Sequence, residues 1–314
     1  MTDELELPEP EPLESATDRP LSPSVLVLPA VAEPPIDERR PWLERRADRL
    51  ERAISVPGSA TPVYLTTDGV AITTTGIGKS DAATTVAALF ATPLLDLSSA
   101  YVVSAGIAGG APDRIALGSV VLADAVVDWD RKHRWDRGEE TEGETPPIER
   151  LAYRPRDYVH RLEPTLVETA LDAAREVDLG DDPDVLAYQR RYPDAPDGGP
   201  TVDRGTTLCG DEFWHGPRYA REAAWLCERY GVDPYVTTQM EDAATATALE
   251  RFDAGKRYLS VRAVSNYDRP APGESVAESF DGTEATLALA IENAERVGSA
   301  VVSELLEVDP LGIR

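Results

Sequence analysis

The stretch YVVSAGIAGGAP at residues 101–112 joins a β-branched apolar run to a segment of glycine and alanine. The apolar run predicts a buried strand over Tyr101–Ala105. The glycine-rich loop follows this strand directly, and ligands of open α/β sheets bind at the carboxyl ends of strands. A missing side chain at Gly106 would let a ligand approach the backbone, although close packing between a strand and a helix also requires glycine.

Further apolar runs and helical periodicities surround this stretch. Strands are predicted at 24–30, 62–66, 70–75, 119–123, 203–208, 234–239 and 257–265, and helices at 79–90, 157–177, 217–230, 242–252 and 283–307. Asp68 and Gly69 form a two-residue hairpin turn between 62–66 and 70–75. Because strands alternate with helices, we expect an α/β fold in one domain, 23–314, with a mostly parallel mixed sheet flanked by helices.

Three segments fall outside this alternation. Residues 1–22 are acidic and proline-rich, which predicts a disordered tail. Residues 129–156 are polar, charged and interrupted by proline, so we expect a long surface excursion there. Residues 180–200 contain several Asp, Gly and Pro turn signals and predict a second polar loop.

The charge of the chain is extreme: 57 Asp and Glu oppose 31 Lys and Arg, for a formal net charge of −26. Only three of the basic residues are lysine. This composition favours a halophilic protein from a high-salt cytoplasm, where a Debye length of about 3 Å at molar salt screens the repulsion. The alternative is an ordinary acidic protein. Either way a nucleic-acid partner is disfavoured, because no basic stripe is available to displace phosphate counterions.

Cysteine usage and the N-terminal sequence indicate the compartment. Cys209 and Cys227 have neither zinc-ligand spacing nor the pattern of a disulfide framework, so we expect reduced thiols and no metal site. The N-terminus lacks the basic and apolar regions of a signal peptide, and no apolar run is long enough to span a bilayer. We therefore expect a cytoplasmic protein without a membrane span.

The segment TTTGIGKS at 73–80 ends like a phosphate-binding P-loop but lacks its first glycine, since position 73 is threonine. Two interpretations remain for Gly76 and Gly78. Either the N–H groups at the start of the following helix face a polar ligand, or the glycines only provide a strand-to-helix turn. Neither glycine segment has the spacing of a dinucleotide-binding loop, which argues against a dehydrogenase, and no cofactor is expected.

Two later segments carry groups that can recognise a nucleoside. CGDEFWHG at 209–216 contains Phe213 and His215, which could stack on a planar base and bond its edge, although a lone histidine is more often structural. TTQMEDAA at 237–244 places Met240 and Glu241 where a strand gives way to a helix. A carboxylate there can accept two hydrogen bonds from a vicinal diol, or can simply cap the helix.

The order of these segments resembles the nucleoside phosphorylase and nucleosidase superfamily. In the short motifs the chain is similar to methylthioadenosine/S-adenosylhomocysteine nucleosidases. Over nearly the whole chain from residue 24 it resembles the purine nucleoside permease family, through TTDG (66–69), AGIAGG (105–110), LGSVVLADAVVD (117–128), TTQMED (237–242) and SNYDRPAPG (265–273). The resemblance implies a soluble phosphorylase/nucleosidase-type domain, a purine nucleoside as its small-molecule partner, and a homo-oligomer.

The resemblance also implies roles for single residues. Glu241 matches the carboxylate that holds the ribose hydroxyls, Met240 the side chain under the sugar, and Phe213 the residue that stacks on the base. Glu33 lies in a place comparable to the glutamate that activates water in nucleosidases. Ser104 stands where similar phosphorylases carry a phosphate-binding arginine.

The strand that ends in VRAVSN carries the expected contacts to the N7 side of the base: Arg262, Ser265 and Asn266. Many relatives in the superfamily have aspartate where this chain has Asn266. Asparagine has no titratable proton, but it can bridge N7 and O6 of a 6-oxopurine. Asp268 could orient that amide or replace the missing acid.

These implied roles predict cleavage of the N-glycosidic bond of purine nucleosides, with 6-oxopurine nucleosides such as inosine and guanosine as substrates. Hydrolysis is favoured over phosphorolysis, because a water-activating glutamate is present and the phosphate-binding arginine is missing. Glu33, Asn266 and Asp268 are the candidate catalytic residues. The alternative is a nucleoside-binding component of an uptake system that cleaves nothing.

Overall fold

The computed structural model describes residues 5–13, 19–136, 145–151, 153, 158–280 and 282–314. Its strands are β1 (Pro10–Pro12), β2 (Val25–Leu28), β3 (Ala32–Glu33), β4 (Ile36–Asp37), β5 (Leu50–Ser55), β6 (Val63–Thr66), β7 (Val70–Ile72), β8 (Tyr101–Gly110), β9 (Val120–Asp128), β10 (Lys132–Arg134), β11 (Ile148–Arg150), β12 (Val159–Arg161), β13 (Val202–Cys209), β14 (Thr237–Gln239) and β15 (Tyr258–Tyr267). Its helices are α2 (Arg40–Arg45), α3 (Gly78–Ala91), α4 (Pro164–Arg175), α5 (Pro183–Gln189), α6 (Pro217–Tyr230), α7 (Asp242–Arg251) and α8 (Glu284–Val308).

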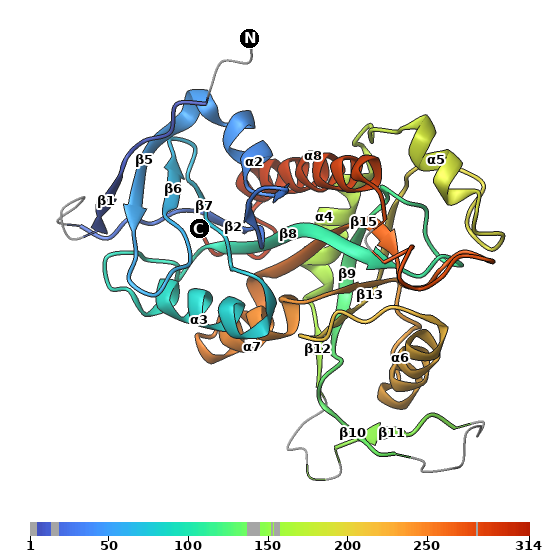
Figure 1. Ribbon diagram of the computed structural model, residues 1–314. Helices are drawn as coiled ribbons and strands as arrows, with labels where there is room; N and C mark the ends of the chain where they lie inside the picture. The colour runs from blue at the N-terminus through green and yellow to red at the C-terminus, as the bar shows by residue number, and fades with distance from the viewer. Residues whose placement is uncertain (1–4, 14–18, 137–144, 152, 154–157, 281) are drawn as a thin grey trace.

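One large sheet organises the molecule. Its strands follow the order β1-β5-β6-β7-β2-β8-β14-β13-β9-β12, and β15 pairs with both β8 and β9. The pairs β2–β8, β8–β15 and β9–β13 are parallel, whereas β5–β6, β6–β7 and β9–β12 are antiparallel. Figure 1 shows α8 on one side of β8, and α3 and α7 on the other. The predicted α/β fold with a mostly parallel mixed sheet is confirmed.

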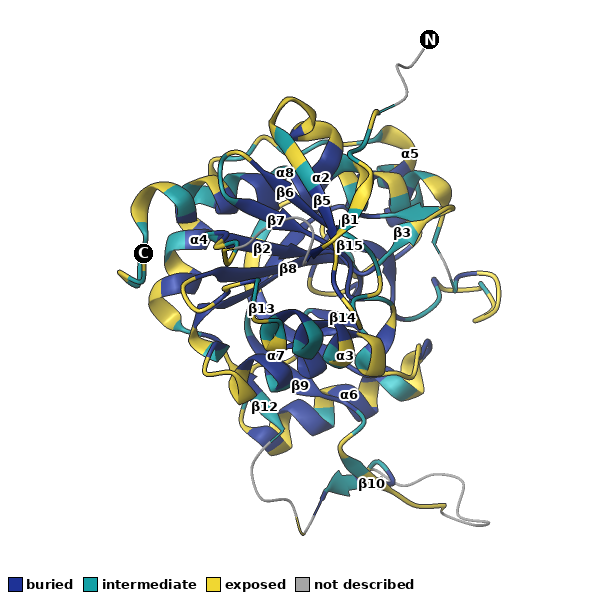
Figure 2. Cartoon of the chain, turned by 90° about the vertical axis from the view of Figure 1, so that its left-hand side faces the viewer, coloured by how far each residue is buried: buried dark blue, intermediate teal, exposed yellow. Residues whose placement is uncertain are grey.

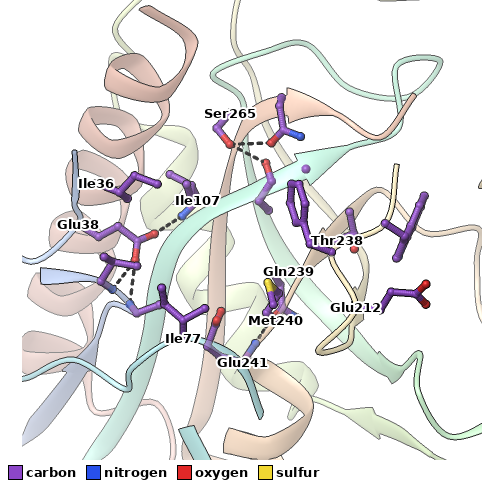
Figure 3. Close-up of a pocket in the computed structure, with 17 residues that line it drawn as sticks. Ile36, Glu38, Ile77, Ile107, Glu212, Thr238, Gln239, Met240, Glu241 and Ser265 are labelled. Carbon is purple, nitrogen blue, oxygen red and sulfur yellow. Dashed lines mark hydrogen bonds between the residues drawn. The ribbon is translucent and has the colours of Figure 1, made fainter. Parts of the chain in front are cut away.

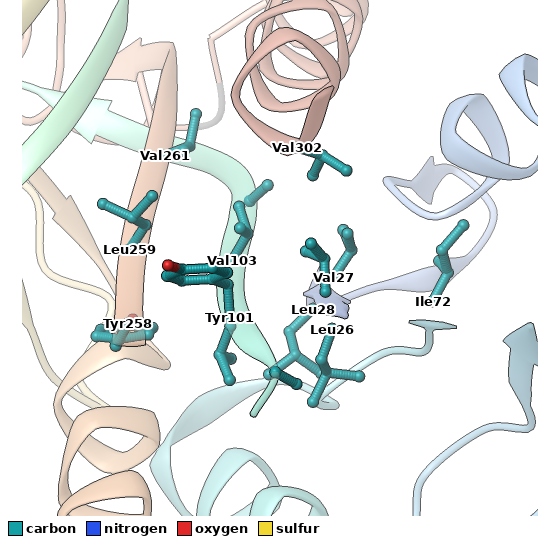
Figure 4. Close-up of a cluster of buried hydrophobic side chains, with 14 of the residues drawn as sticks. Leu26, Val27, Leu28, Ile72, Tyr101, Val103, Tyr258, Leu259, Val261 and Val302 are labelled. Carbon is teal, nitrogen blue, oxygen red and sulfur yellow. The ribbon is translucent and has the colours of Figure 1, made fainter. Parts of the chain in front are cut away.

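The core lies between the central strands and the helices that cover them, α8 among these. Figure 4 shows Val27 of β2, Val103 of β8, Val261 of β15 and Val302 of α8 among its buried side chains. Figure 2 shows that the central strands are almost wholly buried. Strands covered by helices on both faces have no solvated side, which explains their continuous apolar sequences.

The glycine-rich segment after Tyr101–Ala105 is part of a strand, not the predicted loop, because β8 continues to Gly110. Its glycines allow close approach rather than a turn: a β-carbon on Gly110 would lie 2.6 Å from Val264 Cγ1 of β15. The other boundary errors are smaller. The predicted helix 157–177 begins with β12 before α4, and the predicted loop 180–200 contains α5.

The two other segments predicted to be irregular, 1–22 and 129–156, also contain some regular structure. Within 1–22, β1 pairs in parallel with β5 and Leu13 is buried, so this part of the predicted tail is ordered. Residues 1–4 and 14–18 lie outside the described residues. Within 129–156, β10 and β11 form an antiparallel pair that projects from the body in Figure 1. Among the helices that the structure describes, none is long and apolar enough to cross a membrane.

Candidate active site

A cavity of about 170 Å³ opens where four strands of the large sheet end. Its 17 lining residues come from the segment after β2, from Ile77 before α3, from the carboxyl ends of β8 and β15, from the loop before α6 and from the junction of β14 with α7 (Figure 3). Three segments that the sequence singled out, around Gly106, Phe213 and Glu241, meet at this cavity. The carboxyl end of a sheet is where α/β proteins bind ligands, so this cavity is the candidate active site.

The carboxylate on the β2 side of the cavity is Glu38. It is 4% exposed, and three backbone N–H groups hold it. Glu38 Oε2 accepts from Ala30 N at 2.8 Å and Val31 N at 3.0 Å, and Oε1 accepts from Ile107 N at 2.7 Å. Because both carboxylate oxygens are fixed by main chain, the side chain has one orientation, directed at the cavity (Figure 3).

Glu33, which the sequence analysis placed here, is exposed on the short β3–β4 hairpin and does not line the cavity. The structure therefore places Glu38, five residues further along the chain, at the cavity instead of Glu33. The hairpin turns the chain back after Glu33, so that Glu38 and not Glu33 returns to the end of β2. The sequence contained little signal for this choice, since both residues lie in a short segment rich in turn-forming residues.

Glu241 lies at the junction of β14 and α7, 5% exposed. Its carboxylate does not cap α7. Instead, Oε1 accepts a hydrogen bond of 3.0 Å from the backbone N–H of Gly78, the first residue of α3. Burial raises the pKa of Glu241 to about 7, against the opposing effects of the Arg262 charge and the Gly78 N–H. The negative charge of Glu38 adds to this rise, so the two carboxylates influence each other across the cavity.

Gln239, which the sequence analysis did not select, caps α7 in place of Glu241. Its Oε1 accepts from Glu241 N at 2.7 Å and from Asp242 N at 2.9 Å. The Glu241 carboxylate is therefore free of the helix terminus and available to a ligand. An amide three residues before the first residue of α7 is a weak signal that sequence inspection could have used.

The other end of the cavity is formed by an amide and aromatic rings. Asn266 is 7% exposed, and its Oδ1 accepts a 3.0 Å hydrogen bond from Ser265 Oγ. Phe213 is 45% exposed and packs edge-on against Phe280, with ring centroids 4.7 Å apart. Met240 lines the cavity between this end and Glu241. An open aromatic face beside a fixed amide can hold a planar heterocycle.

Two further predicted site residues, Asp268 and His215, also lie outside the cavity lining. The Asp268 carboxylate is 1% exposed and accepts from Tyr235 Oη at 2.6 Å and Arg269 Nε at 2.7 Å. It holds neither the Asn266 amide nor a cavity position, so the expectation that it orients that amide is corrected. The His215 Nε2 atom lies 2.7 Å from Ser279 Oγ, a contact that ties the segment before α6 to the segment before α8.

Arg262 and Gly76 also lie behind the lining. Arg262 is 2% exposed, and Asp242 and Ser104 engage its guanidinium. Its Nη1 lies 3.8 Å from Glu241 Oε2, so its charge acts on that carboxylate from behind the lining. Gly76, with φ of 80°, provides the turn that leads into α3.

An ion-pair cluster beside the cavity joins two of its walls. Lys79 Nζ lies 2.6 Å from Asp128 Oδ1 and 3.0 Å from Asp130 Oδ2. Asp211 accepts from the backbone N–H of Lys79 at 2.6 Å and donates its own N–H to Asp130 at 2.9 Å. The cluster therefore fastens the start of α3 to the loop that carries Phe213.

The charge of the lining is one-sided. Glu38, Glu212 and Glu241 line the cavity, whereas none of its 17 described lining residues is lysine or arginine. The part of the chain that the structure describes also holds no cluster of three or more potential metal ligands.

The family model for purine nucleoside permeases matches residues 22–308 of this chain. The chain belongs to the purine nucleoside permease family. A member of that family in Schizosaccharomyces pombe, named as a probable purine nucleoside permease, is 29% identical over 259 residues, covering 74% of each chain. The purine nucleoside permease of Candida albicans is 26% identical over 300 residues, covering 86% of this chain and 72% of the fungal protein.

Solved structures show the fold that this permease-family chain shares. A methylthioadenosine/S-adenosylhomocysteine nucleosidase of Neisseria meningitidis, in complex with methylthio-immucillin-A, has a TM-score of 0.57 and 21% identity, covering 90% of this chain and 98% of that one. The futalosine hydrolase of Helicobacter pylori has a TM-score of 0.60 and 18% identity, covering 90% and 97%. The nucleosidase fold expected from the sequence is confirmed.

Proposed function

We propose that this protein hydrolyses the N-glycosidic bond of purine nucleosides. The observation that carries the proposal is the convergence of two buried carboxylates, Glu38 and Glu241, with the Asn266 amide on one cavity. Glycoside cleavage through an oxocarbenium-like transition state needs a base for water, a clamp for the sugar and a hydrogen-bond donor for the departing base. These three residues can supply those functions.

In this mechanism Glu241 accepts hydrogen bonds from the two ribose hydroxyls, and Phe213 stacks on the purine. A water molecule attacks C1′ and gives a proton to Glu38 while the bond from C1′ to N9 breaks. The bonding electrons move onto the purine, whose N7 accepts a hydrogen bond from the Asn266 amide. The purine then takes up one proton, so that nucleoside and water yield ribose and free base.

Hydrolysis is favoured over phosphorolysis by the charge of the cavity. A phosphate dianion would meet Glu38 and Glu241 with no lysine or arginine among the described lining residues. Two like unit charges 4 Å apart repel by about 4 kcal/mol at an effective dielectric constant of 20. Arg262 cannot offset this repulsion, because Asp242 already engages its guanidinium.

Asn266 supports 6-oxopurines as substrates. Ser265 Oγ donates to Asn266 Oδ1, so Nδ2 is the group of this amide that can donate to a base, and its present hydrogen bonds to the carbonyl oxygens of Tyr267 and Phe280 are both 3.4 Å long. N7 and O6 of hypoxanthine or guanine are both acceptors, whereas adenine offers a donor at N6. We expect kcat/KM to be at least tenfold higher for inosine than for adenosine, and we expect Asn266→Asp to reduce that ratio.

The deciding experiment incubates the purified protein with inosine in the presence and absence of phosphate. Hydrolysis releases ribose and hypoxanthine at equal rates in both buffers, and Glu241→Ala abolishes the release. Ribose 1-phosphate formed only with phosphate would contradict the hydrolytic proposal.

A second candidate is nucleoside binding without cleavage, as part of uptake. It is supported by Asn266, which has no titratable proton, and by the permease names of the fungal relatives. One solved structure of this fold is a Helicobacter pylori nucleosidase with an aspartate changed to asparagine and 5′-methylthioadenosine in its active site. Saturable inosine binding with no base released after prolonged incubation would favour this candidate.

The cellular context is likewise proposed. We propose a cytoplasmic homo-oligomer adapted to high salt, supported by the net charge of −26 and by the exposed apolar side chains Ile77 and Phe213 at the cavity. Light scattering in concentrated KCl measures the oligomeric state. A melting temperature that rises with KCl concentration supports the adaptation, and one that is independent of it contradicts it.

A further inference from the structure

A buried ion pair lies directly behind the candidate active site. Asp242 is 0% exposed and Arg262 is 2% exposed, and neither belongs to the cavity lining. Asp242 follows Glu241 in the chain, while Arg262 pairs in register with Gly106 of β8. Replacing a buried ion pair with apolar side chains is often neutral or stabilising, so stability alone does not explain this pair.

The Asp242 carboxylate is fully engaged. Its Oδ1 accepts from Ser104 Oγ at 2.8 Å and from Arg262 Nη2, and its Oδ2 accepts from Ser260 Oγ at 2.5 Å and Arg262 Nε at 3.1 Å. Ser104 Oγ in turn accepts from Arg262 Nη2 at 2.6 Å. One edge of the guanidinium is therefore bound to Asp242 and Ser104, which determines the position of the third nitrogen.

That third nitrogen, Nη1, faces the cavity carboxylates. It lies 3.8 Å from Glu241 Oε2. A β-carbon on Gly106 would lie 3.2 Å from Arg262 Nη1 and would collide with Glu38 Oε1, so Gly106 separates the two groups without filling the space between them. The guanidinium is thus close enough to Glu241 to affect its ionisation, but it is oriented by Asp242.

We propose that Asp242 is a positioning residue. By holding the Arg262 guanidinium, it determines how strongly that positive charge interacts with Glu241. It thereby sets the pH range in which the Glu241 carboxylate is ionised and can bind the sugar. This inference rests on the proposed function of Glu241 as the sugar clamp. If Asp242 lost its charge, Arg262 would pair with Glu241 alone.

The ionisable groups around Glu241 agree with this assignment. Burial raises the pKa of Glu241, the Arg262 charge lowers it, and the charges of Glu38 and Asp242 raise it. Burial would also raise the pKa of Asp242, but the charge and hydrogen bonds of Arg262 outweigh this and keep its pKa below the usual value. Burial raises the pKa of the Cys209 thiol and the Tyr258 hydroxyl well above their usual values, so both stay neutral beside Asp242.

The test measures how kcat/KM for inosine depends on pH in Asp242→Asn and Arg262→Lys. We expect the acidic limb of Asp242→Asn to move to lower pH by about one unit or more, because Glu241 loses a negative neighbour and gains the released guanidinium. We expect Arg262→Lys to move the limb to higher pH, because an ammonium group bonded to Asp242 cannot also reach Glu241. Because the two variants should shift the acidic limb in opposite directions, either one alone tests the proposal if the other fails to fold.

Asp268→Asn is the matched control, since Asp268 is also a buried aspartate paired with an arginine but lies outside the cavity lining. The acidic limb of the kcat/KM profile of Asp268→Asn should stay at the wild-type pH, even if the melting temperature of this variant falls. A limb unchanged in both Asp242→Asn and Arg262→Lys overturns the proposal. If the wild-type protein releases no hypoxanthine, the proposed hydrolytic function is wrong, but the role of Asp242 can still be tested. In that case the Kd of inosine is measured over the same pH series for the same variants.

Discussion

The Glu38 carboxylate occupies the space where a β-carbon on residue 106 would stand. This relationship joins two segments that are remote in the sequence, because Glu38 also accepts the N–H of Ile107, the next residue of β8. Residue 106 must be glycine because any side chain there would collide with the Glu38 carboxylate. In turn, the backbone of β8 holds that carboxylate through the Ile107 N–H. The cavity has its proposed base because β8 has no side chain at this position.

Gly106→Ala should therefore displace Glu38 from Ile107 N and reduce kcat at least tenfold. The added methyl group also overpacks the site, which costs typically 1–3 kcal/mol of folding stability. Steady-state kinetics and chemical denaturation measure the two effects. Gly199→Ala is the control, since no atom lies within 4 Å of its added carbon. A Gly106→Ala protein with wild-type kcat would show that Glu38 need not occupy this position.

Glu38→Gln and Glu33→Gln form a matched pair that tests which acid activates water. General-base catalysis contributes typically 10²–10⁴-fold, so kcat of Glu38→Gln should fall by about that factor. Part of the change will be structural, because the new amide NH₂ faces backbone donors. Glu33 is exposed, and its variant should keep kcat within about twofold. The reverse result would return the role of base to Glu33.

The pKa of Glu241 predicts a pH-dependent stability with a definite sign. Its ordinary value is 4.5 and its value in the fold is about 7. Between these values the unfolded carboxyl group is ionised while the folded one still holds its proton, so stability falls as pH rises through this window. Glu241→Gln should remove this loss. Its free energy of unfolding should exceed that of the wild type by roughly 3 kcal/mol above pH 8, and by less near pH 5. Parallel stability curves for the two proteins from pH 5 to 8 would contradict the assignment.

Lys79→Met should weaken both folding and substrate binding. The change leaves the 4% exposed Asp128 without its nearest cation, and breaking a buried ion pair costs about 3–5 kcal/mol. KM for inosine should rise, since the cluster fastens the Phe213 loop to the start of α3. Lys256→Met, at an exposed lysine, controls for the loss of one positive charge. Equal KM values for the two variants would show that the cluster does not support the cavity.

Local patterns were sufficient for much of the fold and for part of the site. β-branched runs and helical periodicity identified β2, β8, α3 and α8, because both patterns depend on neighbours within one element. The motif around Glu241 was selected because it stands at a strand end, and Ser265 and Asn266 were selected through the family resemblance; the structure places all three on the cavity. Strand ends in α/β sheets converge in space, so such residues can be found without coordinates.

Tertiary structure alone decided which charged groups face the cavity. The sequence offered Glu33 and Glu38 in the same short segment, and the choice depends on an N–H group 69 residues away from Glu38. It also offered Arg262 and Asp268 as site residues, but Asp242 engages the first, and Tyr235 and Arg269 bind the second. Burial and charge pairing depend on contacts between distant segments, which composition and periodicity do not encode. The sequence by itself determined where ligand-binding groups occur along the chain, and folding determined which of them remain available.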